Sequence, residues 1–441
     1  MAMSNNGLVW SNFVIRVLSK NDFVFLKSAL SGAVVSIGLD TERNINTWLK
    51  NQDATAPEEV ESLSDASIGL IIPAGYDECT AWRKRFVDRR NNAAHMFILH
   101  FLPTIQCQLE CRYCIENGGD RGVGMRPEIL GQSRKWLLNY LSEHPEIDTF
   151  RLVLFGGEPL LRKDIVKSGV EGFHFISLEK KLSFWIELVS NGELLDEQIA
   201  EFLSKHEWRR VQITLDGPEK VHDARRHGKN YRPTFRKVMK NIKMLLDSDF
   251  IEKVDIRMSI DSENADSLPN LIRCLADLKK QDRINLSIGV ITPTLADMTK
   301  FGNEEFIAEK ALVGWTVAKE CGFGVPKEFI TGPWCVAIAK HSAILQPDGS
   351  LQKCFCTSGR KEYDFGTIYE EPGEYLRDAR FEHFRRTDQC IKEKCQFLPM
   401  CGGGCIHDAV VENGGADGFD RRYCQKSLLE KMNHGLLRLN Y

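Results

Sequence analysis

The sequence predicts an α/β fold: a partial (β/α)6 barrel with an N-terminal winged-helix-like α+β module and a C-terminal cysteine-rich domain. Three observations predict it. Residues 96–322 alternate short apolar runs with helical patterns, residues 1–95 contain three strand-like runs followed by three helical stretches, and residues 323–441 are rich in Cys and Gly. The length of 441 residues supports this division, because it is too great for one ordinary core.

The central part carries six apolar runs that predict strands: Met96–Leu102, Phe150–Phe155, Phe184–Val189, Val211–Leu215, Val254–Ile260 and Ile284–Ile291. Helical patterns separate them, as at Ile129–Leu141, Phe235–Leu246 and Leu268–Leu278. Strands that alternate with helices predict a parallel sheet covered by helices. Six such units fall short of the eight that close a full barrel, and sites in these folds gather at the C-terminal ends of the strands.

The first 95 residues contain short strand-like runs bounded by turn residues and then helical stretches. The runs are Phe13–Leu18, Phe23–Leu26 and Ala33–Leu39, and the helical stretches lie near Thr41–Leu49, Pro57–Leu63 and Tyr76–Arg89. This order is compatible with a winged-helix-like module. A generic α+β cap on the barrel is an equally good interpretation.

The last part, residues 323–441, shows few long helical patterns. Its clearest local signal is Pro347-Asp348-Gly349, which lies between Ala343–Leu345 and Leu351–Phe355 and predicts a hairpin. A domain with so little apolar periodicity is expected to depend on bound metal for its stability.

Composition excludes several classes of protein. Lys plus Arg number 58 and Asp plus Glu number 61, so no strong basic field indicates nucleic acid and no polybasic tail indicates a membrane surface. No apolar run reaches the roughly 18–20 residues that span a bilayer. The first ten residues also lack the basic and apolar regions of a secretory signal. We therefore expect a cytoplasmic protein with neither a nucleic-acid nor a membrane partner.

Fourteen cysteines are many for a reducing compartment, where disulfides are not expected. Most of them are grouped. Cys107, Cys111 and Cys114 form one set, and eight more lie between Cys335 and Cys424, while the remaining cysteines, Cys79, Cys274 and Cys321, stand apart. Such grouping favours ligation of a metal or a cluster.

The first set has the spacing Cys-x3-Cys-x2-Cys and directly follows the first predicted barrel strand, with Tyr113 before the last cysteine. Three thiolates on one tight loop can hold three irons of a 4Fe–4S cube and leave the fourth iron without a protein ligand. A zinc site without a nearby fourth ligand and a set of structural thiols are the alternatives.

With this motif, the sequence resembles the radical S-adenosylmethionine (SAM) superfamily. The resemblance implies that SAM chelates the open iron, that the cluster donates an electron which cleaves SAM, and that a 5′-deoxyadenosyl radical takes hydrogen from the substrate. It also implies an electron donor such as flavodoxin or ferredoxin. The cofactor carries the difficult chemistry in such enzymes, and the protein positions it.

Three further motifs fall at predicted strand ends. The second strand ends in Gly156-Gly157-Glu158-Pro159, where glycines let the backbone approach a ligand and a carboxylate can bind an ammonium group. The resemblance assigns this motif to the methionyl amine of SAM. It assigns to the same pocket Ser190-Asn191-Gly192, Thr214-Leu215-Asp216-Gly217 and, after His222-Asp223, Arg225. Capping or turn chemistry is the alternative for each.

The later cysteines are similar to the seven-cysteine SPASM signature of radical SAM maturases: Cys335, Gly349-x4-Cys354, Cys390-x4-Cys395-x5-Cys401-x3-Cys405 and Cys424. One departure is the Cys-x4-Cys step, where Cys-x2-Cys is usual. The resemblance implies two auxiliary 4Fe–4S clusters. The first cluster would be bound by Cys335, Cys354 and Cys405. Its fourth ligand would be Cys356 or Cys321, or the fourth iron would have no protein ligand. The second cluster would be bound by Cys390, Cys395, Cys401 and Cys424. Zinc ribbons are the alternative.

The resemblance covers residues 96–430 and implies a radical SAM oxidoreductase that modifies a ribosomally made precursor peptide, with a thioether or carbon–carbon cross-link as product. The N-terminal module is expected to bind a leader peptide as an added strand. Two alternatives remain: a maturase that forms formylglycine in anaerobic sulfatases, whose relatives usually begin close to the cysteine motif, and a non-catalytic iron–sulfur or zinc scaffold. No catalytic base stands out.

Overall fold

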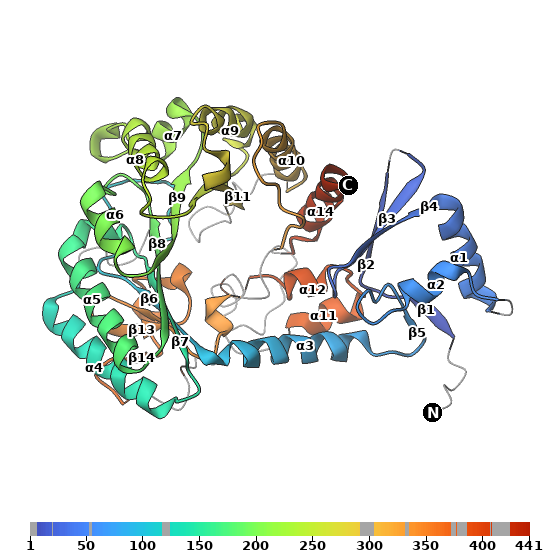
Figure 1. Ribbon diagram of the computed structural model, residues 1–441, viewed down its shortest axis with the longest axis horizontal. Helices are drawn as coiled ribbons and strands as arrows, with labels where there is room; N and C mark the ends of the chain where they lie inside the picture. Colours follow the sequence, from blue (N-terminus) through green and yellow to red (C-terminus); the bar gives the residue numbers. More distant parts are fainter. Residues whose placement is uncertain are drawn as a thin grey trace. The chain divides into compact units, whose positions relative to one another are not determined.

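The computed structural model describes residues 7–19, 21–52, 55–116, 124–291, 304–330, 335–371, 376, 386–405, 407 and 424–441. The chain forms two compact units, each assembled from separate segments of the sequence. The first combines Met1–Arg89, Pro326–Pro333 and His383–Tyr441, and the second combines Arg90–Val325 and Trp334–Glu382. Figure 1 labels most of the elements of both units. The expected division into three domains stays a prediction.

The second unit is built on one sheet with the strand order β11-β10-β9-β8-β7-β6-β12-β13-β14. The six predicted barrel strands are confirmed: β6 (Met96–Phe101), β7 (Thr149–Leu154), β8 (Ser183–Ser190), β9 (Trp208–Leu215), β10 (Val254–Ile260) and β11 (Ile284–Val290). They pair in parallel with their neighbours in sequence order. Their C-terminal ends therefore meet at one edge of the sheet.

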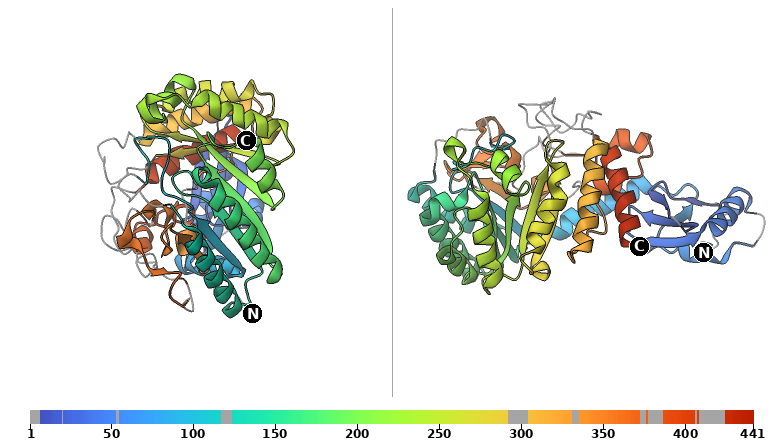
Figure 2. Two further views of the ribbon diagram at one scale, coloured as in Figure 1. Left: turned by 90° about the vertical axis from the view of Figure 1, so that its left-hand side faces the viewer. Right: turned by 90° about the horizontal axis from the view of Figure 1, so that it is seen from above.

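Helices cover the outer face of this curved sheet (Figures 1 and 2). They are α4 (Pro127–Glu143), α5 (Lys163–Glu179), α6 (Glu197–Ser204), α7 (Glu219–Arg225), α8 (Phe235–Asp247), α9 (Leu268–Ala276) and α10 (Glu304–Glu320). On α8, Val238, Ile242 and Leu245 are buried at helical spacing and form its inward stripe. In β9, Val211, Ile213 and Leu215 are fully buried beneath the helices, whereas Gln212 and Thr214 point to the other face. The inner face of the barrel is thus polar.

The predicted hairpin is confirmed by β12 (Ser342–Leu345) and β13 (Ser350–Gln352), which pair antiparallel around Gly349 with its φ of +92°. The second strand ends earlier than predicted, because a 3-10 turn begins at Phe355. The sequence did not indicate that β12 pairs in parallel with β6, nor that β14 (Gly366–Thr367) extends the same sheet.

The first unit contains a three-stranded antiparallel sheet in the order β2-β3-β4. The predicted strands and helices of this part are confirmed as β2 (Val14–Leu18), β3 (Phe23–Ser28), β4 (Val34–Gly38), α1 (Leu39–Asn51), α2 (Glu58–Leu63) and α3 (Glu78–Asn92). A small antiparallel pair of β1 (Leu8–Trp10) and β5 (Ile71–Pro73) was not predicted.

Both faces of this sheet are buried. One face packs on α1 and α2 through residues such as Leu26, Ile45 and Leu63. The other packs Ile15 and Phe25 against apolar residues from the end of the chain. That end forms α11 (Arg386–Lys392), α12 (Leu398–Cys401) and α14 (Lys426–Asn440), so the expectation of few long helices there is wrong for α14. Within the described part of the chain, every helix is too short or too polar to cross a membrane.

Candidate functional site

The first cysteine set lies on a loop that begins where β6 ends. Burial is the main cause that raises the pKa of Cys107 to about 12, and the charges of Glu158, Cys111 and Cys114 raise it further. These four side chains are therefore neighbours. A thiol with so high a pKa is protonated at neutral pH, and a metal that takes up the thiolate would release its proton. Three half-buried thiols on one loop suit a cluster with one open iron.

The glycines of the Gly156-Gly157 pair lie against the cysteine loop. Backbone hydrogen bonds join Gly157 N to Thr104 O at 3.2 Å and Glu158 N to Gln106 O at 2.9 Å. A Cβ on Gly156 would lie 2.3 Å from Thr104 O, and one on Gly157 would lie 2.3 Å from Gln106 O. The sequence analysis expects these glycines to let the backbone approach a ligand closely. In the structure, the backbone of the cysteine loop lies in the space where their side chains would be.

Glu158 is fully buried, and its carboxylate joins two strand ends. It accepts hydrogen bonds from Ser190 Oγ at 2.9 Å, Asn191 N at 2.8 Å and Leu160 N at 3.0 Å. Burial raises its pKa to about 7, against the lowering effect of these hydrogen bonds. The Asn191 amide also lies 3.6 Å from Cys107 Sγ. The ends of β7 and β8 are thereby fixed to the cysteine loop. Contact of Glu158, Pro159, Ser190 and Asn191 with SAM stays a prediction.

Tyr113, the aromatic residue before Cys114, is held on two sides. Its hydroxyl donates to Asp216 at 2.6 Å and accepts from Arg226 Nη1 at 2.6 Å. The Arg225 guanidinium lies 5.3 Å from the centre of the Tyr113 ring and forms an ion pair with Asp261 at 2.7 Å. Arg225 is thus engaged by protein carboxylates, and its predicted contact with SAM stays untested.

Arg226 is a half-buried cation beside the cysteine loop that the sequence did not single out. Burial lowers its pKa, but the charges of Cys111, Tyr113 and Asp216 oppose this effect and raise the pKa well above its usual range. The guanidinium therefore stays charged. A permanent positive charge at this place offsets part of the negative charge that a thiolate-bound cluster carries.

A row of charges crosses the inner face of the barrel below the site. Arg151 on β7 pairs with Glu187 on β8 at 2.7 Å, and Glu187 also contacts Arg210 on β9 at 3.5 Å. Arg210 pairs with Asp255 on β10, which accepts from the Asn285 amide on β11. Five adjacent strands are linked in this way, so each charge in the row has a partner of opposite sign or an amide.

Arg257 lies on the same face of β10, two residues nearer the C-terminal end. Its backbone neighbour on β9 is Thr214, and its guanidinium occupies the space above Gly289. Burial lowers its pKa, while the charges of Tyr113 and Cys356 raise it. No ion pair between the residues that the structure describes includes Arg257. Polar residues at alternate positions of an otherwise apolar strand were the signal that could have identified it.

The auxiliary cysteines fall into both units. In the second unit, burial and then the charge of Cys354 raise the pKa of Cys335 to about 11, so these two are neighbours. Cys356 follows in the same turn, and Cys321 comes after α10. Cys405 belongs to the first unit, and its expected place with Cys335 and Cys354 stays a prediction.

The second expected set lies entirely in the first unit. Burial, and then the charges of Cys395, Cys401 and Cys424, raise the pKa of Cys390 to about 12. The unusual Cys-x4-Cys step has a physical cause. Cys395 N donates to Cys390 O at 2.9 Å, and Lys394 has a φ of +48°. These are features of a Schellman motif, which ends α11 and returns Cys395 toward Cys390.

Comparison with known proteins agrees with this arrangement. The family described as the radical SAM superfamily matches residues 101–275. A serine-type anaerobic sulfatase-maturating enzyme of Bacteroides thetaiotaomicron is 30% identical over 357 residues, which cover 68% of this chain and 80% of that protein.

Two solved structures share the fold. The structure of native anSMEcpe with bound AdoMet and Kp18Cys peptide has a TM-score of 0.61 at 19% identity and covers 78% of this chain and 98% of its own. The crystal structure of Streptococcus suis SuiB bound to precursor peptide SuiA has a TM-score of 0.53 at 13% identity. It covers 95% of this chain and 100% of its own. On the strength of the shared cysteine motif, the fold and these relatives, the chain belongs to the radical SAM superfamily and is an enzyme of its SPASM type.

Proposed function

We propose that this enzyme modifies a ribosomally made precursor peptide by removing hydrogen from a substrate carbon and closing a thioether or a carbon–carbon cross-link. The observation that carries the proposal is the extent of the fold match. The SuiB structure, which holds a precursor peptide, covers 95% of this chain, whereas the anSMEcpe structure covers 78%. The additional coverage favours a peptide maturase that has parts beyond the barrel and the cysteine-rich segment.

The sheet of the first unit offers an edge for a leader peptide. β4 pairs only with β3 among the strands that the structure describes, and α14 packs beside β2 at the opposite edge. An extended peptide can add to an unpaired strand through main-chain hydrogen bonds. We therefore assign leader binding to the outer edge of β4.

The chemistry is assigned to the end of the barrel that carries Cys107, Cys111 and Cys114. A 4Fe–4S cluster bound there with SAM supplies the radical that removes hydrogen. The cysteine loop is held by its hydrogen bonds to Gly157 and Glu158. The inner row of ion pairs from Arg151 to Asp255 lies on the barrel face before the strand ends, so we assign the reacting groups to the strand ends.

Arg257 supplies the binding charge that this site needs. Since no ion pair among the described residues engages it, we assign it to an anionic group of SAM or of the peptide. Replacing it in the Arg257→Met variant is expected to weaken binding of that ligand about 10- to 100-fold, the effect of losing a charge-assisted hydrogen bond. Unchanged affinity for both SAM and the peptide would remove this assignment. Arg209, which is exposed on β9, provides the control variant Arg209→Met.

The grouping of the later cysteines supports auxiliary clusters. Cys335 and Cys354 are neighbours in the second unit, and the charges of Cys395, Cys401 and Cys424 act on Cys390 in the first unit. Sets of thiolates of this kind hold 4Fe–4S clusters in other proteins. The proposal therefore includes auxiliary 4Fe–4S clusters that take the second electron of the oxidation.

A sulfatase maturase is the second candidate, because the Bacteroides thetaiotaomicron relative is 30% identical. One experiment separates the two functions. Anaerobically reconstituted enzyme with SAM and reductant is incubated with a candidate precursor peptide or with a sulfatase-motif peptide, and the products are identified by mass spectrometry. We expect 5′-deoxyadenosine and a precursor that has lost the mass of two hydrogens. Formylglycine in the sulfatase peptide alone, or activity that survives Cys107→Ala, would refute the proposal.

A further inference from the structure

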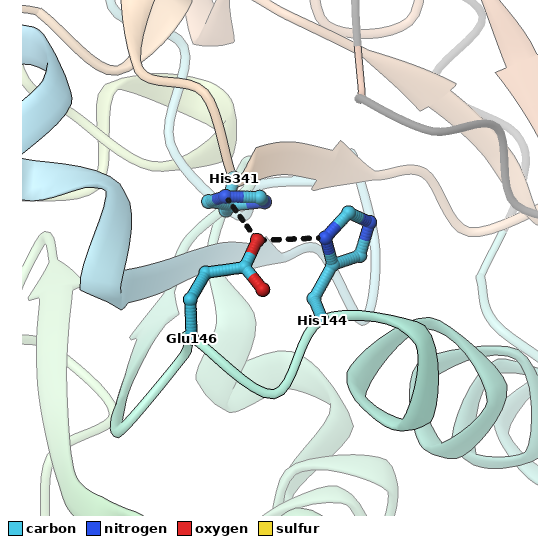
Figure 3. Close-up of side chains that lie close together, drawn as sticks. All are labelled: His144, Glu146 and His341. Atoms are coloured by element: carbon cyan, nitrogen blue, oxygen red, sulfur yellow. Dashed lines mark hydrogen bonds and ion pairs between the residues drawn. The ribbon is translucent and has the colours of Figure 1, made fainter.

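Three polar side chains meet at the end of the barrel that lies opposite the cysteine loop. His144 caps α4, Glu146 follows in the turn that leads to β7, and His341 directly precedes β12. Figure 3 shows the Glu146 carboxylate lying between the two imidazole rings. All three residues belong to the second unit, although His341 is far from the other two in the sequence.

The distances between these side chains suit a tetrahedral metal ion. Glu146 Oε1 lies 2.9 Å from His144 Nδ1 and 3.5 Å from His341 Nε2. One ligand atom from each residue falls within 4.8 Å of the others. Around zinc, with bonds of about 2.0–2.2 Å, ligand atoms lie about 3.3–3.6 Å apart. Small rotations of the side chains would bring all three atoms to that spacing.

The surroundings also favour ligation. His341 Nδ1 lies 2.6 Å from the hydroxyl of Tyr140, a fully buried residue whose ring stacks on Trp136. Ligating histidines usually donate their second ring N–H to such a partner, which leaves Nε2 for the metal. Both imidazoles are buried, whereas half of the Glu146 side chain is exposed, so an ion can enter from solvent.

We propose that His144, Glu146 and His341 bind a divalent transition-metal ion of the zinc type, with water as the fourth ligand. Imidazole nitrogen and carboxylate oxygen are common ligands for this class of ion. The site is remote from the cysteine loop, so the ion is structural. It fastens the segment that enters β12 to the turn between α4 and β7, and it thereby secures the pairing of β12 with β6.

The test uses the enzyme with its iron–sulfur clusters in place, so that the cysteines do not take up zinc. Zinc is added, loosely bound metal is removed by gel filtration, and the zinc and iron contents are measured. X-ray absorption at the zinc edge then identifies the ligands. We expect about one zinc per chain with only nitrogen and oxygen neighbours at about 2.0–2.2 Å, and no sulfur at about 2.3 Å.

The variants Glu146→Gln and His341→Gln are expected to lose this zinc, to keep their iron, and to lose the rise in melting temperature that zinc gives the parent enzyme. Glu146→Gln changes a half-exposed side chain, and its iron content reports whether the fold is intact. His206→Gln is the matched control, because His206 lies 3.0 Å from His174 and, within the part of the chain that the structure describes, this pair belongs to no three-ligand group. Zinc bound through sulfur, zinc that persists in both variants, or no bound zinc would each overturn the proposal.

Discussion

Single atoms decide how closely the Gly-Gly turn can approach the cysteine loop. In a Gly157→Ala variant, the new Cβ would lie 2.3 Å from Gln106 O and 2.4 Å from Ile105 O. Both contacts are with backbone, which cannot rotate away, so the cysteine loop must shift. We expect the variant to lose the iron of the SAM-binding cluster and most formation of 5′-deoxyadenosine, as measured by iron analysis and chromatography.

Gly131 on α4 provides the control for this prediction. A Cβ there has no neighbour within 4 Å, so Gly131→Ala should keep full activity and gain about 0.5–1 kcal/mol of stability from better helix propensity. Equal iron content and activity in the two variants would show that the close approach of Gly157 to the loop is not needed.

The charge of Arg226 is expected to set the potential of the nearby cluster. Removing it in Arg226→Met takes the cationic donor from the Tyr113 hydroxyl and leaves Asp216 with Arg225 alone, and it should make the reduced, more negative cluster harder to form. The shift is expected to be on the order of 50 mV toward negative potential, equivalent to about 1 kcal/mol. Redox titration followed by electron paramagnetic resonance measures it. Arg226→Lys keeps the charge and should restore most of the shift; a Met variant with an unchanged potential would contradict the prediction.

The sequence predicted the residues of the site that follow fixed local spacing. Cys107, Cys111, Cys114 and the Gly156–Pro159 motif could be identified because their order along the chain is itself the signal. Arg226 could not, because it follows Arg225 in a charged stretch, and only the structure shows that Arg226 donates to the Tyr113 hydroxyl whereas Arg225 pairs with Asp261.

Among the strands and helices, too, features that depend on the local sequence could be predicted, whereas features that depend on distant contacts could not. The six barrel strands were predicted because an apolar run is a local property. The pairing of β12 with β6 could not be predicted, because it joins segments far apart in the sequence. The helix α14 was not predicted, although its buried Leu428, Met432 and Leu436 recur at helical spacing.

Because of the row of ion pairs, the stability of the parallel sheet is expected to depend on Arg210. In Arg210→Met, the largely buried carboxylates of Glu187 and Asp255 lose their shared cation. Because Arg210 is itself half-exposed, we expect a loss below the range of about 3–5 kcal/mol for broken buried pairs, about 2 kcal/mol of unfolding free energy. Anaerobic urea unfolding measures it. Arg236→Met breaks an exposed pair with Glu219 and should cost less than about 1 kcal/mol. Equal costs would show that the row does not stabilise the barrel.

At the scale of the whole molecule, the first unit joins the N-terminal sheet and the last cysteines in one core. Phe25 of β3 packs in the same cluster as Phe397 and Leu437, and Cys395 and Cys401 lie at its border. The module assigned to the leader peptide and the cysteines assigned to the second auxiliary cluster therefore share their stability. Domain boundaries drawn along the sequence could not reveal this, since the two parts are separated by the entire barrel.

A prediction about Cys390 follows from this shared core. We expect Cys390→Ala to lose the iron of one four-iron cluster, about four iron atoms per chain, while the cluster at Cys107 still cleaves SAM. Because the cluster cysteines border the core beneath β2 and β3, the variant should also bind the leader peptide more weakly, as measured by calorimetry. Cys274→Ala, on α9 of the second unit, is the control and should keep both iron and affinity. Lost iron with unchanged leader affinity would separate the two functions of the first unit, and unchanged iron would remove Cys390 from the cluster.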